Sequence, residues 1–338
     1  MRILSGIQPT GTLHIGNYLG SVKQWSDMLN DSPEIEAFLM VVDLHAITVP
    51  QDPAVLRRKI YELLAIYLAA GFNPEKDNIF VQSQNPDHPY LGWIFNCITP
   101  FGWMERMTQY KDKKQKMEEY QNIVSVGLFD YPALMAADIL LYDPDMVPVG
   151  ADQKQHVELT RDIAERFNNI YGETFKVPEF RTNKETTNIL DLQNPDKKMS
   201  KSDASAAGRI DLMDTPQGIQ DKLKRAVTDS DNHVAYDPEK KPGVSNLLAI
   251  FSSATGKTVE ELAQAYDGKG YGQFKSDIAD AVVAFLSPLQ EKINTYLSDL
   301  EQLDRIVNNG NERARELSSQ KIALVADKMG LYHDGKKI

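Results

Sequence analysis

The chain has 338 residues, of which 42% are hydrophobic, and this length suffices for two domains with a full-sized core. Its single cysteine, Cys97, excludes an internal disulfide framework and a cysteine-rich zinc site, and its six histidines lack the spacing of metal ligands. The formal net charge of −11 argues against a general nucleic-acid coat, but it leaves room for an RNA held by local basic patches. Residues 1–30 carry no signal-peptide pattern and no apolar run approaches membrane-spanning length, so we expect a soluble, cytoplasmic protein.

The first 82 residues predict alternating strands and helices. Strands are expected at 2–7, 37–42 and 79–82, and the second is apolar throughout, as in a parallel strand buried on both faces. Apolar residues at helical spacing run from Ile15 to Met28. Another helix should begin at Asp52-Pro53, with Asp52 as its N-cap. This alternation indicates a doubly wound parallel sheet.

The turn between the first strand and its helix is rich in glycine, and residues 6–17 read GIQPTGTLHIGN. A strand, a glycine-rich turn and a helix in this order direct backbone N–H groups and the positive end of the helix at a phosphate. Residues 43–46 then follow the second strand at its carboxyl end, where open α/β sheets bind their ligands.

Residues 84–135 are rich in aromatic residues and predict helices, so we expect a helical insertion between the two halves of the sheet. Large apolar residues such as Trp93 and Phe101 favour a homodimer contact, although ordinary core packing would use the same residues. Two lysine-rich groups, at 111–116 and 222–225, are candidate RNA contacts, and each is also compatible with a solvated helix face.

Residues 131–142 are apolar and predict a helix that begins after Pro132 and carries one charged residue, Asp138. A buried carboxylate is costly unless a donor binds it. Asp138 is therefore either a ligand acceptor or a capping or salt-bridged residue.

A further strand is expected at 146–149, and Gly150, Ala151 and Asp152 then open a helix. This arrangement places Asp152 to meet a ribose hydroxyl, although Asp is also a favoured N-cap. The segment KKMSKS at 197–202 combines three lysines with two hydroxyls, a composition suited to binding a polyphosphate.

The chain beyond the lysine segment predicts helices. Their expected starts are Thr215-Pro216, Thr258 (which forms a capping box with Glu261) and Ser287-Pro288, and Gly330 is expected to end the last one.

Five blocks of this sequence carry a resemblance to a known family: GIQPTGTLHIGNYLG (6–20), VDLHAIT (42–48), YPALMAADILLY (131–142), VPVGADQKQHVELTRDIAERFN (147–168) and KKMSKS (197–202). The chain resembles the bacterial tryptophanyl-tRNA synthetases, which are class I aminoacyl-tRNA synthetases. The blocks occur in that family's order, and the segments at 226–231, 241–248 and 268–272 look like its helical domain.

The resemblance implies residue roles. The implied catalytic residues are Lys198, Lys201, His14, Asn17 and Lys113. The implied ATP-binding residues are Gln8, Pro9, Thr10, Gly16, Asn17, Gly150, Ala151, Asp152, Ile189, Lys198, Met199, Ser200, Lys201 and Ser202. Asp138 is implied as the acceptor of the indole N–H, with Leu4, Val42, His45, Met135, Val147, Val149 and Gln153 around the amino acid. Ala151 stands where relatives are expected to carry Glu. No metal bound by the protein itself is implied.

The resemblance also implies a fold and a reaction. A Rossmann-type catalytic domain at 1–205, with the helical insertion at about 84–135, would precede a helical region at 206–338 that binds the tRNA anticodon. A homodimer would activate L-tryptophan with MgATP, release pyrophosphate and transfer tryptophan to the 3′ end of tRNA(Trp). The alternatives are a tyrosyl-tRNA synthetase of the same architecture, a shorter type of nucleotidyltransferase and a catalytically silent tRNA-binding paralogue.

Overall fold

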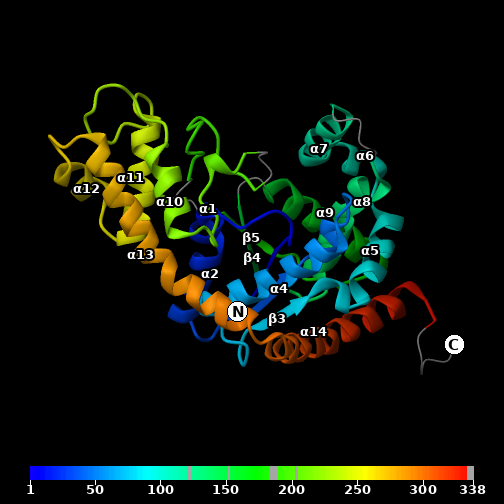
Figure 1. The fold of residues 1–338 in the computed structure, drawn as a ribbon. Helices are drawn as coiled ribbons and strands as arrows, with labels where there is room; N and C mark the ends of the chain where they lie inside the picture. Colours follow the sequence, from blue (N-terminus) through cyan, green and yellow to red (C-terminus); the bar gives the residue numbers. More distant parts are fainter. Residues whose placement is uncertain (120–123, 151–152, 183–188, 202–204, 333–338) are drawn as a thin grey trace.

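The computed structural model describes residues 1–119, 124–150, 153–182, 189–201 and 205–332. Its centre is a parallel sheet of five strands in the order β3-β2-β1-β4-β5 (Figure 1). The strands are β1 (Arg2–Ile7), β2 (Glu36–Val41), β3 (Asn78–Val81), β4 (Met146–Val149) and β5 (Glu179–Thr182). The chain moves outward from β1 on one side through β2 and β3, and then returns to β1 to add β4 and β5. This reversal confirms the predicted doubly wound sheet and places a crevice between β1 and β4.

Alternate residues of the strands face two separate cores. On β2, Leu39 and Val41 pack into a core that also contains Ile3, while Phe38 and Met40 pack into the other core, on the opposite face. Every residue of β2 after Glu36 is buried, as expected of a central parallel strand.

The helices of the first half are α1 (Ile15–Asn17), α2 (Lys23–Asp31), α3 (Asp43–Ala46) and α4 (Pro53–Ala69). A π-helical turn, η1 (Tyr18–Val22), joins α1 to α2. Asp52 caps α4 by accepting a hydrogen bond from the backbone N–H of Val55 at 2.9 Å, which confirms the predicted start of this helix.

The described residues between β3 and β4 are mainly helical and include no strand, which confirms the predicted helical insertion. They form η2 (Gln82–Gln84), α5 (Asp87–Ile98), α6 (Phe101–Glu105), α7 (Thr108–Glu119) and α8 (Val126–Leu140). The predicted start of α8 after Pro132 is wrong, because the helix begins at Val126 and Pro132 lies inside it. Ser125 caps the helix through the N–H of Leu128, and burial of the following alanines outweighs the one backbone hydrogen bond that proline cannot make.

The second half contains α9 (Lys154–Tyr171), η4 (Ala206–Gly208), α10 (Pro216–Lys224), α11 (Pro242–Thr255), α12 (Val259–Ala265), α13 (Tyr271–Leu297) and α14 (Leu300–Met329). The capping box of Thr258 with Glu261 and the left-handed Gly330 after α14 are present as predicted. The predicted start at Ser287-Pro288 is wrong, because α13 runs through both residues. Its continuation is held by buried Leu286 and Leu289, and Gln290 donates hydrogen bonds to the carbonyls of Leu212 and Asp214.

The last helix, α14, returns to the sheet and lies along β3 (Figure 1). Gly310 permits this approach, since a Cβ at this position would lie 1.9 Å from the carbonyl oxygen of Ile79. The Asn311 side chain accepts a hydrogen bond from the backbone N–H of Val81 at 3.0 Å, so α14 covers an edge strand that would otherwise expose unpaired groups. Across the described part of the chain, no helix has the length and apolar character that a membrane span requires.

Candidate active site

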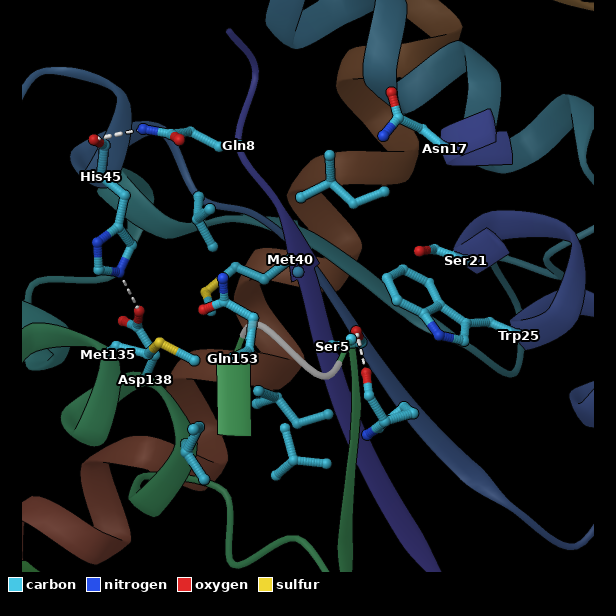
Figure 2. A pocket seen from close by; sticks show the side chains of 18 of the residues that line it. Ser5, Gln8, Asn17, Ser21, Trp25, Met40, His45, Met135, Asp138 and Gln153 are labelled. Carbon is cyan, nitrogen blue, oxygen red and sulfur yellow. Dashed lines mark hydrogen bonds and ion pairs between the residues drawn. The ribbon is translucent and has the colours of Figure 1, made fainter. Parts of the chain in front are cut away.

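A cavity of about 660 Å³ opens at the carboxyl ends of β1 and β4, where the topology of the sheet reverses (Figure 2). Many of the residues predicted from the sequence line it: Leu4, Gln8, Gly16, Asn17, Val42, His45, Met135, Asp138, Val147, Gly150, Gln153 and Lys198. Figure 2 shows His45, Met135, Asp138 and Gln153 together on one side of β1, with Asn17, Ser21 and Trp25 on the other. The cavity therefore has two ends of different chemistry.

One end is built around the carboxylate of Asp138, which is 2% exposed. Nε2 of His45 lies 2.7 Å from Oδ2, and Nδ1 of His88 lies 2.7 Å from Oδ1. The Gln82 amide donates to both oxygens, at 2.8 and 2.9 Å. Burial by itself would raise the pKa of Asp138, but the hydrogen bonds from the two imidazoles hold the pKa well below its usual range.

Apolar side chains form the wall around this carboxylate. Met40, Val42, Met135 and Val147 line the same cavity as Asp138. A charged acceptor in an apolar cavity suits a ligand with a large apolar body and one N–H donor.

The other end is formed by the glycine-rich turn and the start of α1. His14 caps this helix: its Nδ1 accepts from the N–H of Asn17, and the Asn17 side chain accepts from the N–H of His14, both at 3.3 Å. Burial, followed by the nearby positive charges of Lys201, Arg209 and Lys198, lowers the pKa of His14 to about 3. His14 is therefore neutral near pH 7 and acts as a cap.

Gly16 is closely packed by the protein itself. A Cβ at this position would lie 3.1 Å from Nδ1 of His14 and 3.3 Å from the Cβ of Ile189. Gly16 thus lets the turn approach both the His14 ring and the strand-like segment that precedes the lysines.

The lysine segment lies at the end of a short antiparallel pairing. The N–H of Met199 donates to the carbonyl of Ile189 at 3.0 Å, and Leu190 pairs with Lys198. Asn246 of α11 holds Leu190 through both its backbone N–H and its carbonyl, so the helical second half anchors this hairpin. Lys198 reaches the cavity wall from here.

Lys201 closes over the glycine-rich turn. Gly11 has a φ of +65°, and a Cβ there would lie 3.1 Å from both the Cβ and the carbonyl oxygen of Lys201. Burial, together with the positive charge of Lys59, lowers the pKa of Lys201 to about 8. An ammonium group destabilised in this way gains most when a polyanion arrives.

Several predicted residues lie outside the cavity wall: Pro9, Thr10, His14, Ile189, Met199, Ser200 and Lys201. Of these, His14, Ile189 and Met199 are buried beneath the phosphate end, where they support the turn and the hairpin. Ala151, Asp152 and Ser202 fall outside the described residues, as do the side chains of Lys113 and Val149. Their roles stay predictions, as do the ligand contacts of the residues on the wall.

Other functional candidates were missed by sequence reasoning: Ser5, Gly20, Ser21, Trp25, Gln109 and Tyr131 line the cavity, and Gln82 and His88 hold Asp138. The signal for Gln82 was its position directly after β3, at the edge where ligands bind in such sheets. No sequence pattern points to His88, because only the packing of α5 against α8 brings its side chain to Asp138.

A doubly wound parallel sheet whose glycine-rich turn meets a lysine hairpin defines a nucleotide-binding α/β protein. Residues 1–287 match the family described as tRNA synthetases class I (W and Y). The chain is 52% identical over 330 residues to tryptophan–tRNA ligase 2 of Streptomyces avermitilis, covering 97% of this chain and 96% of that protein. It is 50% identical over 329 residues to the tryptophan–tRNA ligase of Bacillus anthracis, covering 97% of this chain and 98% of that protein.

Solved structures give the same result. The tryptophanyl-tRNA synthetase of Mycoplasma pneumoniae superposes with a TM-score of 0.89 at 36% identity, covering 99% of each chain. The enzyme of Campylobacter jejuni, solved with ADP and tryptophan, superposes with a TM-score of 0.85 at 37% identity, covering 98% of this chain and all of that one. The chain belongs to the class I tRNA synthetases of the tryptophan and tyrosine family.

Proposed function

We propose that this protein is a tryptophan–tRNA ligase. The single observation that carries the choice of amino acid is the buried, charged Asp138 at the apolar end of the cavity, opposite the phosphate end. Its carboxylate would accept the indole N–H. A side chain that lacks this donor, such as phenylalanine, would leave the buried charge with one partner fewer, which is a strong basis for rejection.

The chemistry of the two ends of the cavity indicates the reaction. A carboxylate oxygen of tryptophan would attack the α-phosphorus of ATP, and pyrophosphate would leave with its negative charge held by Lys198 and Lys201. Such a displacement needs positioning and charge stabilisation more than a general base. A ribose hydroxyl at the 3′ end of tRNA(Trp) would then attack the carbonyl carbon of the adenylate and release AMP.

Mg²⁺ would enter as the MgATP substrate and share the polyphosphate charge with the lysines. Gln8, Gly16 and Asn17 on the cavity wall would contact ATP, and Lys113 would add a phosphate contact from α7. The remaining implied ATP residues would complete the site when the nucleotide binds.

Residues 1–205 would form the catalytic domain and 206–338 the tRNA anticodon-binding region, with α14 as a helix that returns to the sheet. A homodimer is supported by exposed apolar side chains in the helical insertion: Trp93 is 69% exposed, Phe101 65% and Val126 77%. We place the protein in the cytoplasm, where tRNA is charged.

The test is amino-acid-dependent exchange of labelled pyrophosphate into ATP, run with tryptophan, tyrosine and phenylalanine. Exchange with tryptophan alone is expected. Exchange with tyrosine alone would keep the fold and change the substrate, and folded protein that exchanges with none of the three would contradict the proposed activity.

A further inference from the structure

We infer that a buried chain of hydrogen bonds, running from Ser318 on α14 through Asn85, Tyr142 and His88, orients the Asp138 carboxylate and thereby takes part in selecting the amino acid. This inference rests on the proposed function. By this inference α14, the last helix of the described residues, contributes to specificity although none of its residues lines the cavity.

Each step from Ser318 to Asp138 is within hydrogen-bond distance. Oγ of Ser318 lies 2.8 Å from Nδ2 of Asn85, and the same nitrogen lies 3.1 Å from the Tyr142 hydroxyl. That hydroxyl lies 2.8 Å from Nε2 of His88, whose Nδ1 lies 2.7 Å from Oδ1 of Asp138. Asn85, His88 and Tyr142 are each 1% exposed or less, and Ser318 is fully buried.

The direction of each bond follows from the chemistry of its groups. A charged carboxylate can only accept, so Nδ1 of His88 donates to Asp138. In the neutral imidazole Nε2 is then an acceptor, which makes the Tyr142 hydroxyl its donor. Burial raises the pKa of Tyr142, so the phenol keeps the proton that it donates. The Asn85 amide donates to both the Tyr142 and Ser318 oxygens, and Ser318 donates to Asp87 at 2.6 Å.

The two oxygens of Asp138 therefore differ. Gln82 donates to both oxygens, but Oδ1 is also held from the core by His88, whose side chain is fully buried. Oδ2 faces His45, which lines the cavity and is 13% exposed (Figure 2). Fixing Oδ1 sets the plane of the carboxylate and leaves Oδ2 as the oxygen that a ligand N–H can share. A network in which every member has a partner holds such a geometry more rigidly than one bond would.

α14 anchors the end of this hydrogen-bond network that lies farthest from Asp138. Arg315 donates from its guanidinium to the carbonyl of Gln84, and Asn311 binds the N–H of Val81. These contacts fix both sides of η2, the turn that carries Gln82 and precedes Asn85. Movement of α14 would consequently reach Asp138 through two of its three side-chain partners, Gln82 and His88.

The test uses two variants and two controls. Tyr142→Phe removes one hydroxyl and keeps the ring stacked on Phe38. Ser318→Ala removes the hydroxyl that ends the hydrogen-bond network on α14. Tyr67→Phe removes another buried hydroxyl, which donates to the carbonyl of Met40 and takes no part in this hydrogen-bond network. Ser319→Ala changes the neighbouring exposed serine on α14.

The measurement is kcat/KM in pyrophosphate exchange for tryptophan, divided by that for β-(3-benzothienyl)alanine, in which sulfur replaces the indole N–H. Loss of folded protein lowers both rates equally and leaves this ratio unchanged, whereas a misplaced acceptor lowers the ratio. Tyr142→Phe should lower the ratio roughly three- to tenfold, the size of one net hydrogen bond, and Ser318→Ala by less. The KM for ATP should not change.

The controls should keep the parent ratio. The inference is overturned if folded Tyr142→Phe and Ser318→Ala proteins keep the parent ratio, or if Tyr67→Phe lowers it as much. If Tyr142→Phe does not fold, Ser318→Ala alone decides. Parent protein without tryptophan-dependent exchange would instead overturn the proposed function, and with it the substrate on which this inference depends.

Discussion

The two ends of the cavity differ in how their charges are held. At the amino-acid end, the negative charge of Asp138 is buried and already bound by three side chains. At the phosphate end, burial lowers the pKa of His14, and the positive charges of Lys201, Arg209 and Lys198 lie close enough to His14 to lower it further. The protein itself completes the amino-acid end, whereas the phosphate end presents lysines whose charge a polyanion would stabilise.

This difference separates selection from catalysis. A preorganised acceptor can discriminate between amino acids because its geometry is fixed before the ligand arrives. Positioned lysines gain most from the charge that develops on a leaving pyrophosphate, so they act on the rate. Variants at the two ends should therefore affect different measurements.

The largest effect is expected from Asp138→Ala. Removing the acceptor should reduce discrimination between tryptophan and phenylalanine by roughly 10⁴-fold, the scale of a site built around one buried hydrogen bond. Pyrophosphate exchange with each amino acid measures this. Asp130→Ala is the matched control, because this carboxylate lies on the same helix and binds Asn96. Discrimination that survives in Asp138→Ala would end the assignment of the carboxylate.

Lys201→Ala should lower the rate of activation by roughly 10²- to 10³-fold, as expected for the loss of one positioned donor. Tryptophan affinity, measured by equilibrium binding without ATP, should be nearly unchanged because the amino-acid end is intact. Lys240→Ala, which changes an exposed lysine outside the lysine segment, serves as the control. An unchanged turnover number in Lys201→Ala would contradict the role of the lysine hairpin.

Gly310→Ala tests how closely α14 packs against β3, the strand that leads into Gln82. The new methyl group would clash with the carbonyl of Ile79 and should cost about 2 kcal/mol of unfolding free energy, within the usual cost of overpacking. Urea denaturation measures this. Gly272→Ala is the control, since a Cβ there meets open space near the start of α13. Equal free energies of unfolding for the two variants would show that α14 is not closely packed against β3 at Gly310.

The smallest effect concerns pH. Lys201 has a pKa of about 8, and ATP binding favours its charged form. Above pH 8 the free protein must take up a proton to bind ATP, so the Kd should rise, by about tenfold between roughly pH 8 and pH 9 at most. Lys201→Arg stays charged over this range and should show a flatter dependence. Parallel pH profiles of the two proteins would refute this prediction.

Local sequence determined the alternating elements, the caps at Asp52 and Thr258, the glycine-rich turn and the lysine segment. Each of these depends on residues within a few positions of one another, so spacing and residue type suffice to predict it. Family resemblance added the residues around the cavity. Local rules failed at Pro132 and Pro288, because tertiary burial outweighs one missing hydrogen bond inside a helix.

Only the tertiary structure decided how Asp138 is held. The sequence left it as an isolated charge in an apolar helix, whereas the fold brings His45, Gln82 and His88 to it from three other elements. Ser318 joins the same network from 180 residues further along the chain. A hydrogen-bonded network across such separations leaves no periodic pattern in the sequence, because its members are neighbours only after the sheet and its helices have packed.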